Sequence, residues 1–165
     1  MAQITSTGKW RMLPVITILT VVADQVTKHV ILATMRPYEV IGVIPGFFNI
    51  VRVHNPGGAF GFMAGHVHGS QSALFLAASL LAACLVLYLY KATPLNYPYM
   101  LAGLSLIFGG AMGNLIDRVR FGAVIDFLDF HAGELHWPAF NVADSAITIG
   151  LTILVFHIMT RKEPD

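Results

Sequence analysis

The sequence predicts an all-α membrane protein, in which four transmembrane helices carry a small β-sheet and loop region on one side of the membrane. Apolar residues make up 56% of the 165 residues and charged residues only 12%, about half the charged fraction of an ordinary soluble domain. Four apolar runs each come close to the roughly 20 residues that a helix needs to cross a bilayer. The length suits one integral-membrane domain over residues 1–165. A net charge of +1 gives no electrostatic reason to expect nucleic acid as a partner.

The four spans are expected at about residues 12–31, 72–90, 97–115 and 141–160. The first run follows Lys9 and Arg11, as the apolar core of a secretory signal would. It is longer than such a core, it contains Asp24 and Lys28, and three further spans follow it. We therefore interpret it as the first transmembrane helix.

Basic residues indicate the orientation of the spans, because four spans place both termini on one side. On that side lie Lys9, Arg11, Lys91, Arg161 and Lys162, whereas Arg36 and Arg52 fall on the other side. By the positive-inside rule, the termini are cytoplasmic, and the connections at about 33–71 and 119–140 lie outside. The count is weakened by three basic residues near the outer ends of the spans, Lys28, Arg118 and Arg120.

Polar residues recur along one face of the first helix. They follow one another at three- and four-residue steps: Thr17, Thr20, Asp24, Thr27 and Lys28. Asp24 and Lys28 have the i,i+4 spacing of a helical ion pair. This spacing fits a pair that only orients the helix as well as one that supports a site.

The long connection after the first helix is expected to form a small sheet. Residues 47–53 are aromatic and β-branched, which is typical of a strand. Pro45-Gly46 indicates a turn before it, and Val40 to Ile44 is the candidate partner strand. A connection of this length is rarely a plain linker, and on the outer surface the sheet could lie on the membrane.

This strand runs into Asn55-Pro56-Gly57-Gly58. Glycine allows unusual backbone angles and close approach of another chain, and Asn55 offers both a donor and an acceptor. Taken alone, the segment is most simply an ordinary turn. His66 and His68 follow in a Gly-rich loop without further ligands nearby, so we predict no metal site there.

The second helix is apolar all round, which indicates packing and lipid contact, whereas the third carries two stripes of interest. Ser105, Gly109 and Gly113 form a small-residue face suited to close helix packing. Beside it, Gly110, Asn114 and Arg118 repeat at the same four-residue step. Polar groups at membrane depth must find partners, so Asn114 and Arg118 are candidate site residues.

Asp144 lies at the start of the last apolar run, where an ionisable residue is a functional candidate by default. Its candidate partners are Asp126 and Asp129 in the second outer connection, and spacing alone does not choose between them. Two carboxylates can share a proton and activate a water, as in aspartic proteases. The simpler interpretation is that Asp144 only caps its helix.

Two other function classes are compatible with these residues. The first alternative is a small membrane transporter or channel subunit, with an intramembrane relay of Asp24, Lys28, Asp126 and Asp144. A transporter is expected to show internal repeats and broken helices, and the two halves of this chain show no convincing repeat. The second is an assembly protein whose polar residues only hold helices together, which leaves the paired aspartates unexplained.

The whole chain resembles the lipoprotein signal peptidases, or signal peptidase II. Five blocks carry the resemblance in order: Asp24-Gln25-Val26-Thr27-Lys28, Asn55-Pro56-Gly57-Gly58-Ala59-Phe60, Gly113-Asn114-Leu115-Ile116-Asp117-Arg118, Val124-Ile125-Asp126-Phe127 and Phe140-Asn141-Val142-Ala143-Asp144-Ser145. The second block is a slight variant of the family's usual Asn-x-Gly-Ala-Ala form. Each block alone is weak, but five in order are highly specific.

The resemblance implies an aspartyl endopeptidase of the bacterial inner membrane, with its active site near the periplasmic face. Such enzymes remove the signal peptide from diacylglyceryl-modified prolipoproteins, cut just before the lipidated cysteine, and are inhibited by the cyclic peptide globomycin. By analogy, the catalytic residues are Asp126 and Asp144. Residues that support the site or contact substrate are Asp24, Lys28, Asn55, Gly57, Asn114, Arg118, Asn141 and Ala143. The resemblance implies contact with membrane lipids and neither a metal nor another cofactor.

Overall fold

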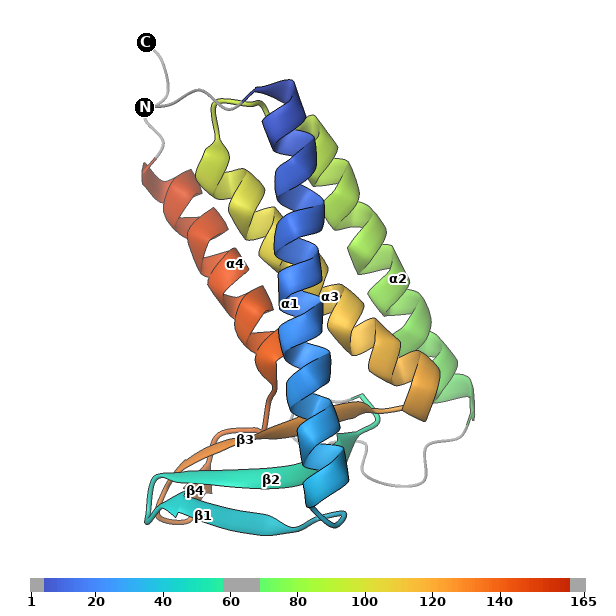
Figure 1. Ribbon diagram of the computed structural model, residues 1–165, viewed down its shortest axis with the longest axis vertical. Coiled ribbons are helices and arrows are strands. Elements are labelled where there is room, and N and C mark those ends of the chain that lie inside the picture. Colours follow the sequence, from blue (N-terminus) through green and yellow to red (C-terminus); the bar gives the residue numbers. More distant parts are fainter. Residues whose placement is uncertain (1–4, 58–68, 161–165) are drawn as a thin grey trace.

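Four long helices form a bundle, and a small sheet closes one end of it (Figure 1). This computed structural model describes residues 5–57 and 69–160. The helices are α1 (Ser6–Thr34), α2 (Gly69–Ala92), α3 (Pro98–Phe121) and α4 (Val142–Thr160). All four are long and apolar enough to cross a membrane, as predicted. The start of α1 and the end of α4 lie at the bundle end opposite the sheet (Figure 1).

The helices extend beyond the predicted spans, because hydropathy marks the part inside the bilayer and not the helix ends. The first helix begins at Ser6, where the Thr5 hydroxyl accepts the N–H of Gly8 at 3.1 Å. The third was expected to end near residue 115 but continues to Phe121, and Gly122 with φ 70° ends it in the left-handed conformation. The extra turns of α3 carry charged residues close to the sheet.

The sheet has four antiparallel strands in the order β1-β2-β3-β4. They are β1 (Val40–Ile44), β2 (Phe48–Asn55), β3 (Val124–Ala132) and β4 (Leu135–His136). The two strands predicted in the first connection are confirmed. Strand β3 was expected only as part of the second outer connection, because its residues show no two-residue alternation of apolar and polar side chains. Its first four residues are all buried. Its pairing with β2 sets Asp126 opposite Val53.

Helix α3 packs against all three other helices and is the centre of the bundle. Its small-residue face permits this, as predicted. A Cβ atom on Gly109 would lie 2.8 Å from Cβ of Thr20 on α1, and one on Gly113 would lie 2.6 Å from Oδ2 of Asp24. Gly110 packs on the Ala143 carbonyl oxygen of α4. This close packing brings the polar stripes of α1, α3 and α4 together.

Candidate functional site

Polar side chains from α1, α3, β3 and the start of α4 meet where the bundle joins the sheet. They come from segments far apart in the chain, and most are shielded from solvent. Exposed fractions of 6% or less are found for Asp24, Lys28, Asn114, Asp117, Asp126 and Asn141. Buried polar groups of this kind must satisfy one another, so their hydrogen bonds define the site.

Asp126 is held by two asparagine side chains. Asn55 Nδ2 donates to its Oδ2 at 3.0 Å, and Asn141 Nδ2 donates to its Oδ1 at 2.7 Å. The other end of the Asn55 amide accepts the N–H of Gly57 at 3.0 Å, at a φ of 111° that only glycine adopts readily. The turn after β2 therefore points the side-chain amide NH2 group of Asn55 at Asp126. Gly58, Ala59 and Phe60, the rest of that block, lie outside the described residues, as do His66 and His68.

Asp144 lies in the first turn of α4 but does not cap it. Asn141 is the capping residue, and its Oδ1 accepts the N–H of Asp144 at 2.9 Å. In return, Asp144 Oδ2 accepts the N–H of Asn141 at 3.2 Å, the reciprocal pattern of a capping box. Asn114 Nδ2 donates to the other oxygen, Oδ1, at 2.8 Å. The simpler expectation for Asp144 was therefore wrong in assigning the cap to it.

Asn114 and Asn141 join Asp126 to Asp144. Asn141 contacts both aspartates, and its Nδ2 lies 3.2 Å from Asn114 Oδ1. Asp129 belongs to a different cluster, in which its carboxylate accepts from Asn49 Nδ2 at 2.9 Å and contacts His136 Nδ1 at 2.8 Å. The structure thus brings Asp126, and not Asp129, together with Asp144.

The surroundings of the two β3 aspartates differ in their effect on proton affinity. Burial raises the pKa of Asp126 to about 7; the hydrogen bond from Asn55 opposes this rise and the charge of Asp144 adds to it. Burial acts in the same direction on Asp129, but hydrogen bonds from Asn49 and His136 outweigh it and lower the pKa of that carboxyl. A carboxyl that exchanges its proton near neutral pH is suited to acid–base chemistry.

Arg118 lies half-buried on α3 beside the aspartates. Its Nη1 donates a long hydrogen bond, 3.4 Å, to the carbonyl oxygen of Asn114. Its charge interacts with Asp144, Asp126 and Asp117. Its Nε is buried and has no hydrogen-bond partner among the described residues. The guanidinium therefore has donor capacity available next to the paired carboxylates.

Lys28 is the cation at the centre of the buried network. The predicted ion pair with Asp24 is confirmed, with Nζ 2.9 Å from Oδ2. Lys28 also lies 2.7 Å from Oδ2 of Asp117 and donates to Asn114 Oδ1 at 3.1 Å. Removing one partner from a buried charge cluster typically costs about 3–5 kcal/mol, because the remaining charge is left uncompensated.

Asp117 was not predicted as a site residue. It is fully buried, pairs with Lys28 and accepts from Gln25 Nε2 at 2.9 Å. The signal in the sequence was its three-residue spacing from Asn114, which places both on one face of α3. Gln25 was missed as well, since its role depends on α3 lying beside α1. The last expected residue, Ala143, contributes its main-chain N–H, which Asp24 Oδ1 accepts at 3.0 Å.

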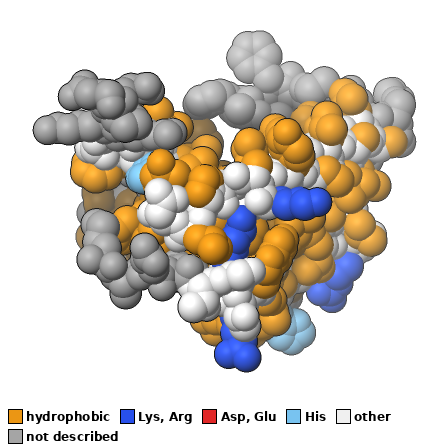
Figure 2. Space-filling model, turned by 90° about the horizontal axis from the view of Figure 1, so that it is seen from above, with side chains coloured by type: hydrophobic (Ala, Val, Ile, Leu, Met, Phe, Trp, Pro, Cys, Tyr) orange, Lys and Arg blue, Asp and Glu red, His pale blue; other side chains and the backbone are white. Residues whose placement is uncertain are grey.

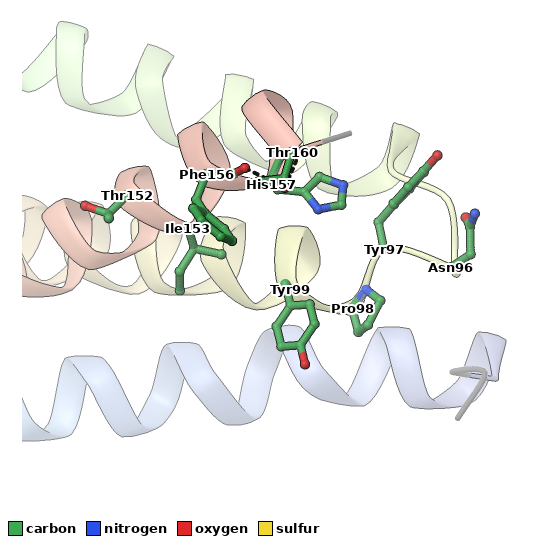
Figure 3. Close-up of a pocket in the computed structure, with 9 residues that line it drawn as sticks. All are labelled: Asn96, Tyr97, Pro98, Tyr99, Thr152, Ile153, Phe156, His157 and Thr160. Atoms are coloured by element: carbon green, nitrogen blue, oxygen red, sulfur yellow. Dashed lines mark hydrogen bonds between the residues drawn. The ribbon is translucent and has the colours of Figure 1, made fainter. Parts of the chain in front are cut away.

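A hollow lies at the end of the bundle opposite the sheet, between the start of α3 and the end of α4 (Figure 3). Its volume is about 630 Å³, and the lining is mainly aromatic and aliphatic, including Tyr99, Ile153 and Phe156. The rings of Tyr97 and His157 meet edge to face there, 5.0 Å apart. Among the described residues, no carboxylate lines it, so these residues offer none of the chemistry of the Asp126 and Asp144 region.

Comparison with known proteins gives a consistent result. A family model described as signal peptidase (SPase) II matches residues 16–160. A lipoprotein signal peptidase of Desulforapulum autotrophicum is 52% identical over 142 residues, 86% of this chain and 88% of that protein. One from Syntrophus aciditrophicus is 43% identical over 145 residues, 88% of this chain and 90% of that protein. A solved bacterial membrane enzyme superimposes with a TM-score of 0.82 at 32% identity, covering 100% of this chain and 98% of the other.

Proposed function

The chain belongs to the signal peptidase II family of membrane peptidases, and from this premise we propose that it is an aspartyl endopeptidase acting on diacylglyceryl-modified prolipoproteins. It removes the signal peptide by cutting the bond just before the lipidated cysteine. Asp126 and Asp144 are its catalytic residues. The observation that carries this proposal is the pair of carboxylates bridged by Asn114 and Asn141 at the sheet end of the bundle. Family membership favours this function over a transporter or channel subunit.

The dyad performs general acid–base catalysis. An ionised carboxylate takes a proton from a water, which attacks the scissile carbonyl. The protonated partner donates its proton to the carbonyl oxygen, which gives a tetrahedral intermediate. The carboxyl that took the proton from water then donates it to the leaving amine as the C–N bond breaks, and a hydroxyl of the intermediate returns a proton to the partner. Burial supports this division, because it raises the pKa of Asp126 to about 7 and so keeps one proton on the pair near neutral pH. The proton belongs to the coupled pair and not to one aspartate alone.

The remaining site residues orient the dyad and the substrate. Asn55 and Asn141 donate to Asp126, and Asn114 donates to Asp144, so each carboxylate has a fixed direction. Arg118 is always charged and does not transfer protons at working pH. Its available donors suit the main-chain carbonyls of a bound peptide. The diacylglyceryl chains stay in the bilayer, while the peptide reaches the polar region between the helices.

The distribution of charge supports a cytoplasmic location for the termini in a bacterial inner membrane. Seen from the end at which α1 starts and α4 ends, the described surface shows Lys and Arg side chains among apolar ones and no acidic side chain (Figure 2). Basic residues concentrate on the cytoplasmic side of membrane proteins. In this orientation the sheet and the dyad lie near the periplasmic face, where lipid-modified precursors are processed.

The proposal is tested with the purified protein in detergent micelles and a precursor carrying a diacylglyceryl-cysteine. We expect cleavage, with mass spectrometry giving a product that begins at the lipidated cysteine. The same peptide without the lipid is the control and should be cut far more slowly. Globomycin should block the reaction. Absence of cleavage, or cleavage at another bond, would contradict the proposed function.

A further inference from the structure

The segment carrying Asp144 is tied to α1 by one buried carboxylate. Asp24 Oδ1 accepts the N–H of Ala143, the residue immediately before Asp144, at 3.0 Å. Both Asp24 and Ala143 are fully buried. The side chain of Asp24 therefore fixes the backbone from which Asp144 projects.

The segment carrying Asp126 is tied to α3 in the same way. Asp117 Oδ2 accepts the N–H of Ile125, the residue immediately before Asp126, at 3.1 Å. Asp117 and Ile125 are also fully buried. Two carboxylates on different helices thus hold the backbone directly before each of the two aspartates.

Lys28 joins these two carboxylates. Its ammonium lies 2.9 Å from Asp24 and 2.7 Å from Asp117, with side-chain exposures of 2% or less for all three. It also donates to Asn114 Oδ1 at 3.1 Å. An ammonium has donors only, so it must face the amide oxygen of Asn114. The amide NH2 group of Asn114 then faces Asp144, and its Nδ2 donates to Asp144 Oδ1 at 2.8 Å.

We propose that Lys28, Asp24 and Asp117, here called the Lys28 cluster, position the two catalytic aspartates relative to each other. The inference rests on the proposed function and deepens it. The three residues are positioning residues, because they are buried and act through the main chain before each aspartate and through Asn114. The buried carboxylates of Asp24 and Asp117 cannot bond to water in place of Lys28. Loss of the Lys28 charge therefore shifts both carboxylates, and with them the main chain at Ala143 and Ile125.

The test is the variant Lys28→Met, which keeps a long side chain and removes the charge. Displacement of a catalytic group by about 1 Å can lower the rate about a hundredfold. We therefore expect kcat on the lipid-modified precursor to fall by about that factor, with KM little changed. The pH–rate profile should also move to higher pH, because Lys28 favours the ionised form of Asp126. A residue needed only for folding would lower the amount of folded protein without moving the profile.

Lys9→Met is the matched control. Lys9 is a second buried lysine of α1, and it donates to the carbonyl oxygens of Lys91 at 3.0 Å and Thr93 at 2.6 Å. It lies in the first turn of α1, whereas Lys28 lies near the end of that helix. We expect this variant to lose thermal stability while the folded protein keeps the wild-type kcat and pH profile.

Asp117→Asn provides a second variant of the Lys28 cluster, since an amide cannot accept along both edges as Asp117 does from Lys28, Gln25 and Ile125. It too should lower kcat and leave KM little changed. Wild-type kcat and pH profile in either folded variant would overturn the inference. So would failure of both variants to fold, since the cluster would then be a folding element. Inactive wild-type protein would instead contradict the proposed function itself.

Discussion

Asn141 donates from its side-chain Nδ2 to Asp126 Oδ1 at 2.7 Å, while its side-chain Oδ1 caps α4, the helix that carries Asp144. One asparagine thus orients the first aspartate and starts the helix of the second. Burial favours the protonated form of Asp126, whereas the side-chain amide NH2 group of Asn141 stabilises the ionised form. The outcome of this competition gives a measurable dependence on pH.

Stability should fall as pH rises through neutrality, and Asp126 should be a main cause. The pKa of Asp126 is raised from 3.8 to about 7, so the folded state binds a proton that the unfolded chain has already lost. The contribution of this group is complete below about pH 4 and is lost as pH rises through about 7. Thermal unfolding in detergent between about pH 5 and 9 measures it. Asp126→Asn should flatten this dependence; an unchanged slope would contradict the pKa assignment.

Much of the fold could be predicted from the sequence, because local patterns determine it. Hydropathy indicated the four spans, and β-branched and aromatic residues indicated β1 and β2. The four-residue spacing of Asp24 and Lys28 predicted their ion pair, which the structure contains at 2.9 Å. The small-residue face of α3 predicted close helix packing, and in the structure Gly109 and Gly113 pack against α1.

The details of the site depend on contacts between distant segments, and for this reason the sequence left them open. The choice of Asp126 over Asp129 follows from the contacts of Asp126 with Asn55 and Asn141, which no local pattern encodes. Asp117 gained its role only when α1 brought Lys28 to it. The cap of α4 is Asn141 and not Asp144, whose carboxylate accepts the N–H of Asn141 in return.

Arg118→Lys should impair turnover strongly without moving the pH optimum. Lysine keeps the charge but loses the planar fork of donors that suits peptide carbonyls. Because Arg118 does not transfer protons, the pH–rate profile should keep its shape while kcat falls. Steady-state kinetics across pH are compared with wild type. Near-normal turnover would make Arg118 a simple interface charge, and a displaced optimum would mean that it tunes the dyad directly.

Gly113→Ala should destabilise the bundle and lower activity. The new methyl group would lie 2.6 Å from Asp24 Oδ2, and that carboxylate is held by Lys28 and cannot move freely. Overpacking of this kind typically costs about 1–3 kcal/mol. Gly42→Ala is the matched control, because its methyl group would meet Asn49 Oδ1 at an ordinary 3.7 Å. Thermal unfolding of both variants decides the point, and equal stabilities would refute the close packing.

Topology reporters should place the dyad on the periplasmic side. Fusions after Lys91 and at the C-terminus should read cytoplasmic, because basic residues gather there. Fusions near Ser70, at the start of α2, and near Gly133, in the connection between α3 and α4, should read periplasmic. The reverse pattern would put the sheet end of the bundle on the wrong side for lipoprotein maturation.

The dyad itself is tested most directly by cleavage of a diacylglyceryl-modified precursor by three matched Asp→Asn variants. Asp126→Asn and Asp144→Asn should each abolish product formation while the protein still inserts and folds, since each removes one half of the acid–base pair. Asp129→Asn should retain substantial activity, because Asp129 bonds to Asn49 and His136 away from the dyad. Product is measured by mass spectrometry at equal amounts of folded enzyme. Full activity in either dyad variant would contradict the account.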